Sequence, residues 1–95
     1  LEREDIVELL NDFREYLGGM LPDLEKAVAA SDFAAIRSLT HALKGSSGNL
    51  RISDIYEVAK KMQDASETKQ AAVLKSLMSE MKHHGERFMA ESQAL

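Results

Sequence analysis

The chain has 95 residues, 44% of them hydrophobic, no cysteine, and a formal net charge of −4 at pH 7 from 12 basic and 16 acidic side chains. The length and apolar fraction predict one small globular domain, and the lack of cysteine excludes disulfides, thiolate chemistry and cysteine metal sites, which fits a cytoplasmic origin. The acidic balance argues against a surface for nucleic acid or anionic membranes, so the expected partner is a protein.

The first predicted element is a long amphipathic helix from Ile6 to Val28, because its apolar residues recur at intervals of three and four. This stripe consists of Ile6, Leu9, Leu10, Phe13, Leu17, Met20, Leu21, Leu24, Ala27 and Val28. Gly18, Gly19 and Pro22 interrupt the helix chemically, since proline lacks a backbone N–H and clashes with the preceding turn. We therefore expect a helix that is kinked or broken near residues 18–22, the alternative to a kink being two helices joined by a loop.

A second helix is predicted to begin after Ser31-Asp32, where a side-chain oxygen can accept from the first free amides. Its apolar stripe consists of Ile36, Leu39, Leu43 and Leu50, with Thr40 and Ser47 at the edge. At about 100° per residue, His41 lies on the order of 150° from the centre of this stripe. The histidine is therefore expected to face outward, flanked by Arg37, Lys44 and Gly48.

The run Gly45-Ser46-Ser47-Gly48 leaves the end of this helix open. Gly45 could cap a helix that ends at Lys44, or the helix could continue to about Leu50. Continuation keeps Leu50 in phase with the stripe and leaves a turn before Ser53-Asp54, a good start for the next helix. Two glycines inside the helix would each lower its stability by roughly 1 kcal/mol relative to alanine. Such glycines would be explained if another surface had to approach closely beside His41.

Two further amphipathic helices are predicted, from about Ser53 to Ala65 and from Lys69 to about Glu91, with Thr68 as the N-cap of the last. The inward residues of the third are Ile55, Tyr56, Ala59 and Met62, with Gln63 at the edge, and those of the fourth are Leu74, Leu77, Met78, Met81, Gly85 and Phe88. Four such helices with short connections predict an all-α, antiparallel, up-down-up-down four-helix bundle that forms one domain over residues 1–95. A core complete within one chain predicts a monomer.

His41 is the candidate for chemistry. A neutral imidazole, with an ordinary pKa of about 6.5, keeps a lone pair at neutral pH and can accept a phosphoryl group. Lys44, one turn further on, can neutralise the added charge. The carbonyl of Gln63 can accept a hydrogen bond from one ring nitrogen and so orient the other outward. The alternatives are a surface histidine without a function and a glutamine that binds water.

Other kinds of site find little support in the sequence. His83 and His84 are adjacent, hence about 100° apart on a helix, and cannot chelate a metal from one face as an i, i+4 pair does. We expect His83 to be exposed, His84 to flank the core, and neither to bind metal. No phosphate-binding loop, dinucleotide fingerprint or catalytic triad is present, so the chain has no visible means of binding ATP.

The run from His41 to Leu50, His-Ala-Leu-Lys-Gly-Ser-Ser-Gly-Asn-Leu, resembles almost position for position the motif of histidine-containing phosphotransfer (HPt) domains from bacterial-type two-component phosphorelays. The resemblance extends to the preceding Ala-Ser-Asp-Phe turn and to Gln63, which lies 22 residues after His41, where these domains often carry Glu or Gln. It covers most of residues 5–90, and residues 33–63 are distinctive.

This resemblance implies roles for individual residues. His41 would be the phosphoacceptor, Lys44 would contact the phosphoryl oxygens and Gln63 would orient the histidine. Gly45 and Gly48 would keep the surface low where a receiver domain docks, and Arg37 would lie on that docking face. Arg51 departs from the family pattern, because a glycine is common after the Asn-Leu pair, and this leaves the shape of the turn open.

The resemblance also implies the function of a phosphorelay intermediate. A receiver domain with a phosphorylated aspartate would dock over His41, transfer its phosphoryl group and leave, and a second receiver would collect the group. The chain would need no cofactor of its own, and Mg²⁺ would come with the receiver. Two alternatives stay open: a kinase dimerisation domain, which usually has an acid where this chain has Ala42, and a helical adaptor bundle whose histidine is never phosphorylated.

The sequence shows neither a membrane span of roughly 20 apolar residues nor a signal peptide. The chain begins at Leu1 rather than at a methionine. We therefore expect a piece of a longer protein, such as a hybrid sensor histidine kinase, and a cytoplasmic location, which includes the cytoplasmic part of a membrane-anchored kinase.

Overall fold

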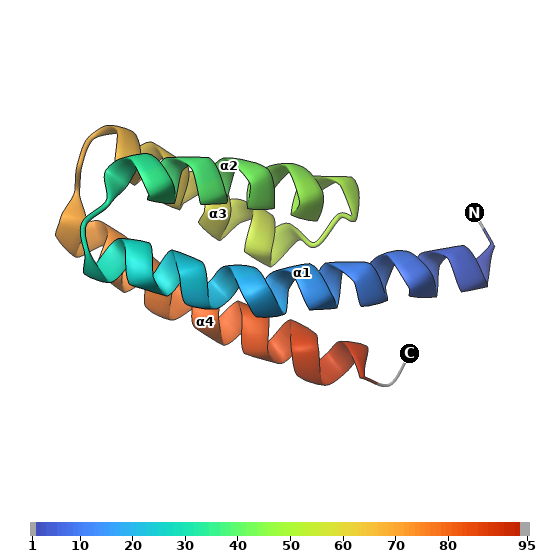
Figure 1. The fold of residues 1–95 in the computed structure, drawn as a ribbon. Coiled ribbons are helices and arrows are strands. Elements are labelled where there is room, and N and C mark those ends of the chain that lie inside the picture. Colours follow the sequence, from blue (N-terminus) through green and yellow to red (C-terminus); the bar gives the residue numbers. More distant parts are fainter. Residues whose placement is uncertain (1, 94–95) are drawn as a thin grey trace.

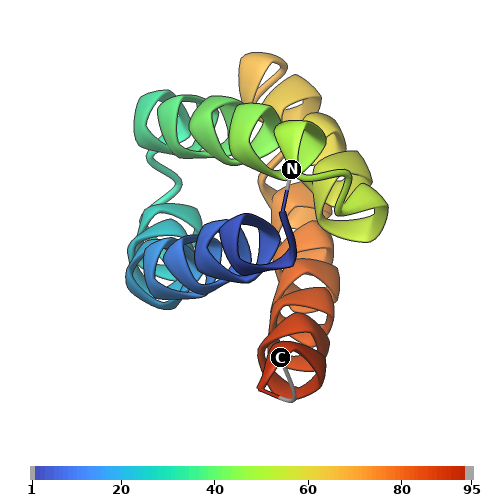
Figure 2. The ribbon, with the colours of Figure 1, turned by 90° about the vertical axis from the view of Figure 1, so that its right-hand side faces the viewer.

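The computed structural model describes residues 2–93, which form four helices and no strand. The helices are α1 (Arg3–Ala29), α2 (Phe33–Asn49), α3 (Ser53–Glu67) and α4 (Ala71–Ser92). They run alternately in opposite directions (Figure 1). Each packs against the next, and α4 also packs against α1. Figure 2, the view from the end at which both termini lie, shows the four helices around a common centre, where their buried apolar residues form one core. The predicted antiparallel four-helix bundle is confirmed.

Helix α1 runs without interruption through Gly18, Gly19 and Pro22. The expectation of a break or loop near residues 18–22 is therefore wrong, and a kink there stays a prediction. Gly18 and Pro22 are exposed, so water can reach the carbonyl that proline leaves without a helical partner. On the opposite face Leu17 and Leu24 are fully buried, and this packing holds both halves of the helix on the same core.

The first turns of α1 extend past the connection between α2 and α3 (Figure 1). Helix α1 has 27 residues and α2 has 17, which correspond to about 40 Å and about 25 Å. Near this end of α1, Ile6 and Leu9, which the periodicity assigns to the apolar stripe, are 44% and 42% exposed. The buried part of the stripe begins at Phe13.

The three connections between helices have the same length and the same backbone design. Each has three residues, at 30–32, 50–52 and 68–70. The middle residue is left-handed in every case, with φ of 52° at Ser31, 58° at Arg51 and 55° at Lys69. The backbone N–H of the residue after it donates a hydrogen bond to a carbonyl in the last turn of the preceding helix. These bonds run from Asp32 to Ala27 at 2.9 Å, from Ile52 to Ser47 at 2.9 Å and from Gln70 to Ala65 at 3.0 Å. This is the Schellman motif.

Arg51 therefore takes the backbone conformation that a glycine would take most readily. The sequence left the shape of this turn open, and the structure shows that the turn has the same form as the other two despite the Arg51 side chain. A left-handed conformation costs a residue with a Cβ atom about 1–2 kcal/mol, so the connection between α2 and α3 is closed at some expense in stability.

The predicted caps have different outcomes at the starts of α2 and α4. The Asp32 side chain accepts a hydrogen bond from the Ala35 amide at 3.2 Å, so this N-cap is confirmed. Thr68 is not the N-cap of α4, since α3 continues to Glu67 and α4 begins only at Ala71. The Thr68 hydroxyl instead donates to the Asp64 carbonyl at 3.3 Å and satisfies the end of α3.

The core contains more polar groups than the sequence suggests. Thr40 and Ser47 are fully buried rather than at the edge of the α2 stripe. Their hydroxyls donate to the carbonyls of Ile36 and Leu43, each at 2.7 Å. A buried hydroxyl that bonds to the preceding helical turn leaves no donor unpaired, so both side chains pack as small core residues.

Candidate functional site

Helix α2 carries the run from Thr40 to Asn49 as one continuous helix through both glycines. The alternative end at Lys44 is therefore wrong. Because Leu43 is fully buried, the opposite face of α2 is turned away from the core. His41, Gly45 and Gly48 are exposed on that side, and Lys44 is half-buried. The prediction of an outward-facing histidine is confirmed.

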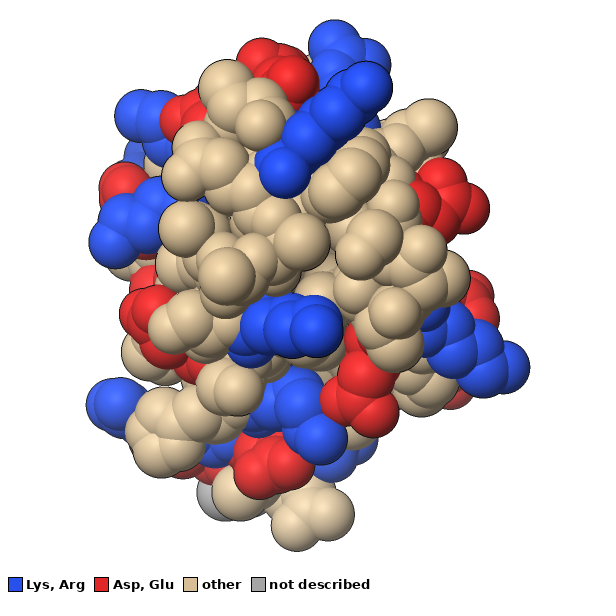
Figure 3. Space-filling view, turned by 90° about the vertical axis from the view of Figure 1, so that its left-hand side faces the viewer, with Lys and Arg blue, Asp and Glu red and all other residues tan. Residues whose placement is uncertain are grey.

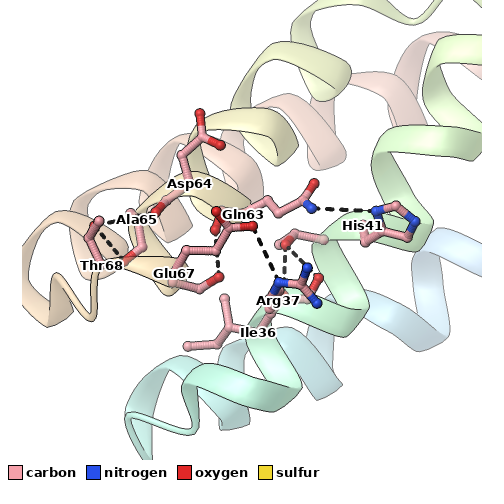
Figure 4. A network of polar contacts seen from close by, with 10 residues as sticks. Ile36, Arg37, His41, Gln63, Asp64, Ala65, Glu67 and Thr68 are labelled. Carbon is pink, nitrogen blue, oxygen red and sulfur yellow. Dashed lines mark hydrogen bonds and ion pairs between the residues drawn. The ribbon is translucent and has the colours of Figure 1, made fainter.

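His41 is in contact with α3 through Gln63 (Figure 4). The Nε2 atom of Gln63 lies 3.4 Å from Nδ1 of His41. Gln63 itself is buried, with 9% of its surface exposed, and its Oε1 atom is buried without a hydrogen-bond partner among the described residues. The predicted contact exists, but the amide nitrogen rather than the carbonyl oxygen faces the ring. Since the two ring nitrogens lie on opposite sides of the imidazole, Nε2 of His41 is directed away from Gln63.

Arg37 lies one turn before His41 and is paired with α3. Its Nε atom is 3.3 Å from Oε1 of Glu67, and the two side chains are 60% and 47% exposed (Figure 4). The charge of Arg37 is thus offset locally. Sequence reasoning missed Glu67, although a signal exists: Glu67 follows Gln63 by four residues and Arg37 precedes His41 by four, so antiparallel packing brings them together.

Gly45 and Gly48 differ in their surroundings. A Cβ atom added to Gly45 would have no atom within 4 Å, so this position borders open space. A Cβ atom added to Gly48 would lie 3.3 Å from Cδ2 of Tyr56 on α3, closer than ordinary contact. Gly48 therefore makes room for an aromatic ring of the neighbouring helix in addition to being exposed, a packing reason that the sequence did not reveal.

An apolar surface of α1 adjoins the outward face of α2. Leu9 and Tyr16 are 42% and 37% exposed. Together with Ser46 and Asn49 of α2 they line a shallow groove between the two helices. The surface near His41 thus continues from small side chains on α2 to larger apolar ones on α1.

The remaining histidines form no metal centre, because no three His, Cys, Asp or Glu side chains within residues 2–93 come close enough to hold an ion. His83 is exposed and His84 is half-buried, as predicted. His84 lies beside α3, with its Nδ1 atom 3.4 Å from Oδ2 of Asp54. None of the helices formed by residues 2–93 has both the length and the apolar character of a membrane span.

Charged side chains of both signs are interspersed on the end of the bundle that carries the connections α1–α2 and α3–α4 (Figure 3). Uncharged side chains fill the space between them, and neither sign covers this face continuously.

Comparison with known proteins bears on this site. A family model described as "Hpt domain" matches residues 8–89. The matched span includes His41, Lys44 and Gln63 and reaches from the second turn of α1 to the last turns of α4. No curated protein and no solved structure matches the chain significantly.

Proposed function

Since the chain belongs to the family of Hpt domains, which carry phosphoryl groups in two-component phosphorelays and interact with receiver domains, we propose that its phosphoacceptor is His41. In this proposal His41 takes the group from the aspartyl phosphate of one receiver and passes it to the aspartate of another. The chain is then a carrier that supplies the nucleophile and a docking face.

One observation carries the proposal: His41 is exposed while its Nδ1 atom is in contact with a buried side chain of another helix. A surface histidine without a function needs no such partner. Gln63 is held in place by burial, so it can restrict the rotation of the ring and keep Nε2 turned outward. This is the arrangement that an in-line attack by Nε2 needs.

The chemistry is a simple exchange of bonds. The Nε2 lone pair attacks phosphorus, a P–N bond forms, and the P–O bond to the receiver aspartate breaks with its electron pair on the carboxylate. The proton on Nδ1 stays on the ring throughout. Return transfer to a second receiver reverses the same steps.

This step requires the ring tautomer with its proton on Nδ1, because only that form has a free lone pair on Nε2. The Nδ1–H group must then donate a hydrogen bond to Oε1 of Gln63. Rotation of the terminal amide by a half turn exchanges the two amide atoms and brings Oε1 to the ring. It also gives this buried oxygen, which is otherwise unpaired, a donor. We assign the reactive form to this rotamer.

Lys44 and the docking face complete the proposal. Lys44 lies one turn after His41 on α2 and is half-buried, so its ammonium group can contact the phosphoryl oxygens from a restricted position. Mg²⁺ held by the receiver would offset further charge on the transferring group. Gly45 leaves space for the receiver, and Leu9 and Tyr16 offer it apolar surface.

The test is transfer of labelled phosphoryl groups to the purified domain. We expect a phosphorylated receiver to label the domain, ATP alone not to label it, and the label to be lost in acid, as a phosphoramidate is. The His41→Gln variant should stay unlabelled and fold normally. Label from ATP alone would favour a kinase dimerisation domain. No label from any of several receivers would favour an adaptor bundle and overturn the proposal.

The tautomer has its own test. In ¹⁵N NMR spectra of the imidazole at a pH where it is neutral, we expect the proton on Nδ1. The Gln63→Glu variant, whose carboxylate can only accept, should retain this tautomer and transfer. The Gln63→Leu variant should lose the preference and transfer more slowly. Equal tautomer populations in all three proteins would remove Gln63 from the site.

A further inference from the structure

Two polar stripes face each other along the contact between α2 and α3. Their members are spaced identically, at steps of four, three and four residues, in opposite chain directions. On α2 the stripe consists of Arg37, His41, Lys44 and Gly48, and on α3 it consists of Glu67, Gln63, Lys60 and Tyr56. Because the helices are antiparallel, each member of one stripe should face the member of the same rank in the other.

Three of the four ranks are observed as contacts. Arg37 lies 3.3 Å from Glu67, and His41 lies 3.4 Å from Gln63. In the last rank, a Cβ atom on Gly48 would lie 3.3 Å from the Tyr56 ring. The register between the two helices is therefore constant over the whole length of the stripes, and it places Lys60 opposite Lys44.

The two lysines have no acidic partner in residues 2–93. Glu57 and Asp64 lie one turn to either side of Lys60 on α3, yet the ion pairs within 4.0 Å in this part of the chain include neither Lys44 nor Lys60. By contrast Arg37, on the other side of His41, is paired with Glu67. The positive charge one turn before His41 is thus offset by Glu67, whereas the positive charges of Lys44 and Lys60 have no such partner in residues 2–93.

Two like charges that face each other are unfavourable unless an anion lies between them. We propose that Lys60 is a second cation for the phosphoryl group on His41 and contacts its oxygens together with Lys44, one from each helix. This inference rests on the proposed function of His41. The flexible four-carbon stem of lysine lets Lys60, which is exposed, reach across the contact between the helices.

The experiment uses domain phosphorylated with phosphoramidate, a small donor that needs no receiver. The ³¹P resonance of the phosphohistidine is followed against pH. Loss of a neighbouring cation destabilises the dianion, so Lys60→Gln should raise the pKa of the phosphoryl group. Transfer from a phosphorylated receiver should be slower by roughly two- to fivefold, the range expected for one exposed charge pair. Lys60→Arg should restore both.

Lys61→Gln is the matched control, because it makes the same change of charge one residue away. Lys61 is about 100° further round the helix and lines a groove with Val73 and Leu77 of α4. We expect the phosphoryl pKa and the transfer rate of the Lys61→Gln variant to equal those of the unaltered domain. The double variant Lys44→Gln/Lys60→Gln should lose more rate than either single variant, and far-ultraviolet circular dichroism should show all of them folded.

The outcomes separate the two proposals. If the unaltered domain is phosphorylated on His41 but Lys60→Gln and Lys61→Gln behave alike in pKa and rate, Lys60 has no part in the site. If His41→Gln retains all of the phosphoramidate label, the phosphoacceptor is another residue, and both the proposed function and the assignment of Lys60 fail.

Discussion

Gly85 at the contact between α1 and α4 and Gly45 on the outward face of α2 serve opposite purposes. A Cβ atom on Gly85 of α4 would lie 2.8 Å from Cδ1 of Leu21 on α1, so these helices meet without space to spare. Beside the outward contact of α2 and α3, a Cβ atom on Gly45 would meet nothing within 4 Å. Gly85 thus lets two helices pack closely, whereas Gly45 leaves the surface beside His41 unobstructed.

The largest effect is expected at the contact of α1 and α4. Gly85→Leu should lower the free energy of unfolding by about 1–3 kcal/mol, because the added atoms must displace the Leu21 side chain. Urea denaturation measures the loss. Leu21→Ala in the same chain should recover part of it by making room. An unchanged midpoint in Gly85→Leu would show that this contact is looser than the distances indicate.

The next effect concerns the connection that joins α2 to α3. Arg51→Gly should raise the free energy of unfolding by about 1 kcal/mol, because glycine adopts the left-handed conformation without the penalty of a Cβ atom. Thermal and urea unfolding report the gain. Arg51→Ala removes the same charge but keeps the Cβ atom, so it should give no such gain. Equal stabilities of the two variants would assign the effect to charge.

At Gly45, substitution by alanine should bring a comparable gain in stability together with a loss of function. Gly45→Ala should stabilise the domain by up to about 1 kcal/mol through helix propensity, while slowing transfer from a receiver, since the methyl group protrudes where the receiver docks. Gly19→Ala is the control, because Gly19 is also an exposed helical glycine with nothing within 4 Å of an added Cβ atom. It should give the same stabilisation with normal transfer. Normal transfer in Gly45→Ala would remove this position from the docking face.

The smallest effect is expected for the ion pair of Arg37 and Glu67. Glu67→Gln should lower the free energy of unfolding by about 0.2–1 kcal/mol, since both side chains are largely solvated. The difference from the unaltered domain should vanish in 1 M salt, where such charges are screened. A difference that persists at high salt would indicate a packing contribution from Glu67 instead.

Much of the fold follows from periodicity. The stripes of α2 and α4 keep phase over many turns, so residues such as Leu43 and Met81 could be placed in the core, and the opposite face of α2 gave the exposure of His41. Asp32 was predictable as a cap because a carboxylate before an apolar run has few other structural uses. Periodicity placed Gln63 at the edge of the α3 stripe, and its spacing of 22 residues from His41 in the resembling family linked it to the histidine.

The remaining features depend on which helices meet and at what register. Ile6 and Leu9 fit the stripe of α1 but are largely exposed, because α1 is longer than its neighbours, a mismatch that no single helix reveals. Thr68 had the chemistry of an N-cap but satisfies the preceding helix instead. Glu67 and the packing of Tyr56 on Gly48 needed the pairing of α2 with α3, which becomes visible once the two stripes are aligned.

The three short connections also have a consequence for how the chain folds. With three residues in each, every helix is followed at once by the neighbour it packs against. Most contacts therefore join residues close in sequence, and only the meeting of α1 with α4 closes a long loop. Topologies of such low contact order fold in microseconds to milliseconds, so the α2–α3 hairpin that carries His41 can form without waiting for the two ends of the chain to meet.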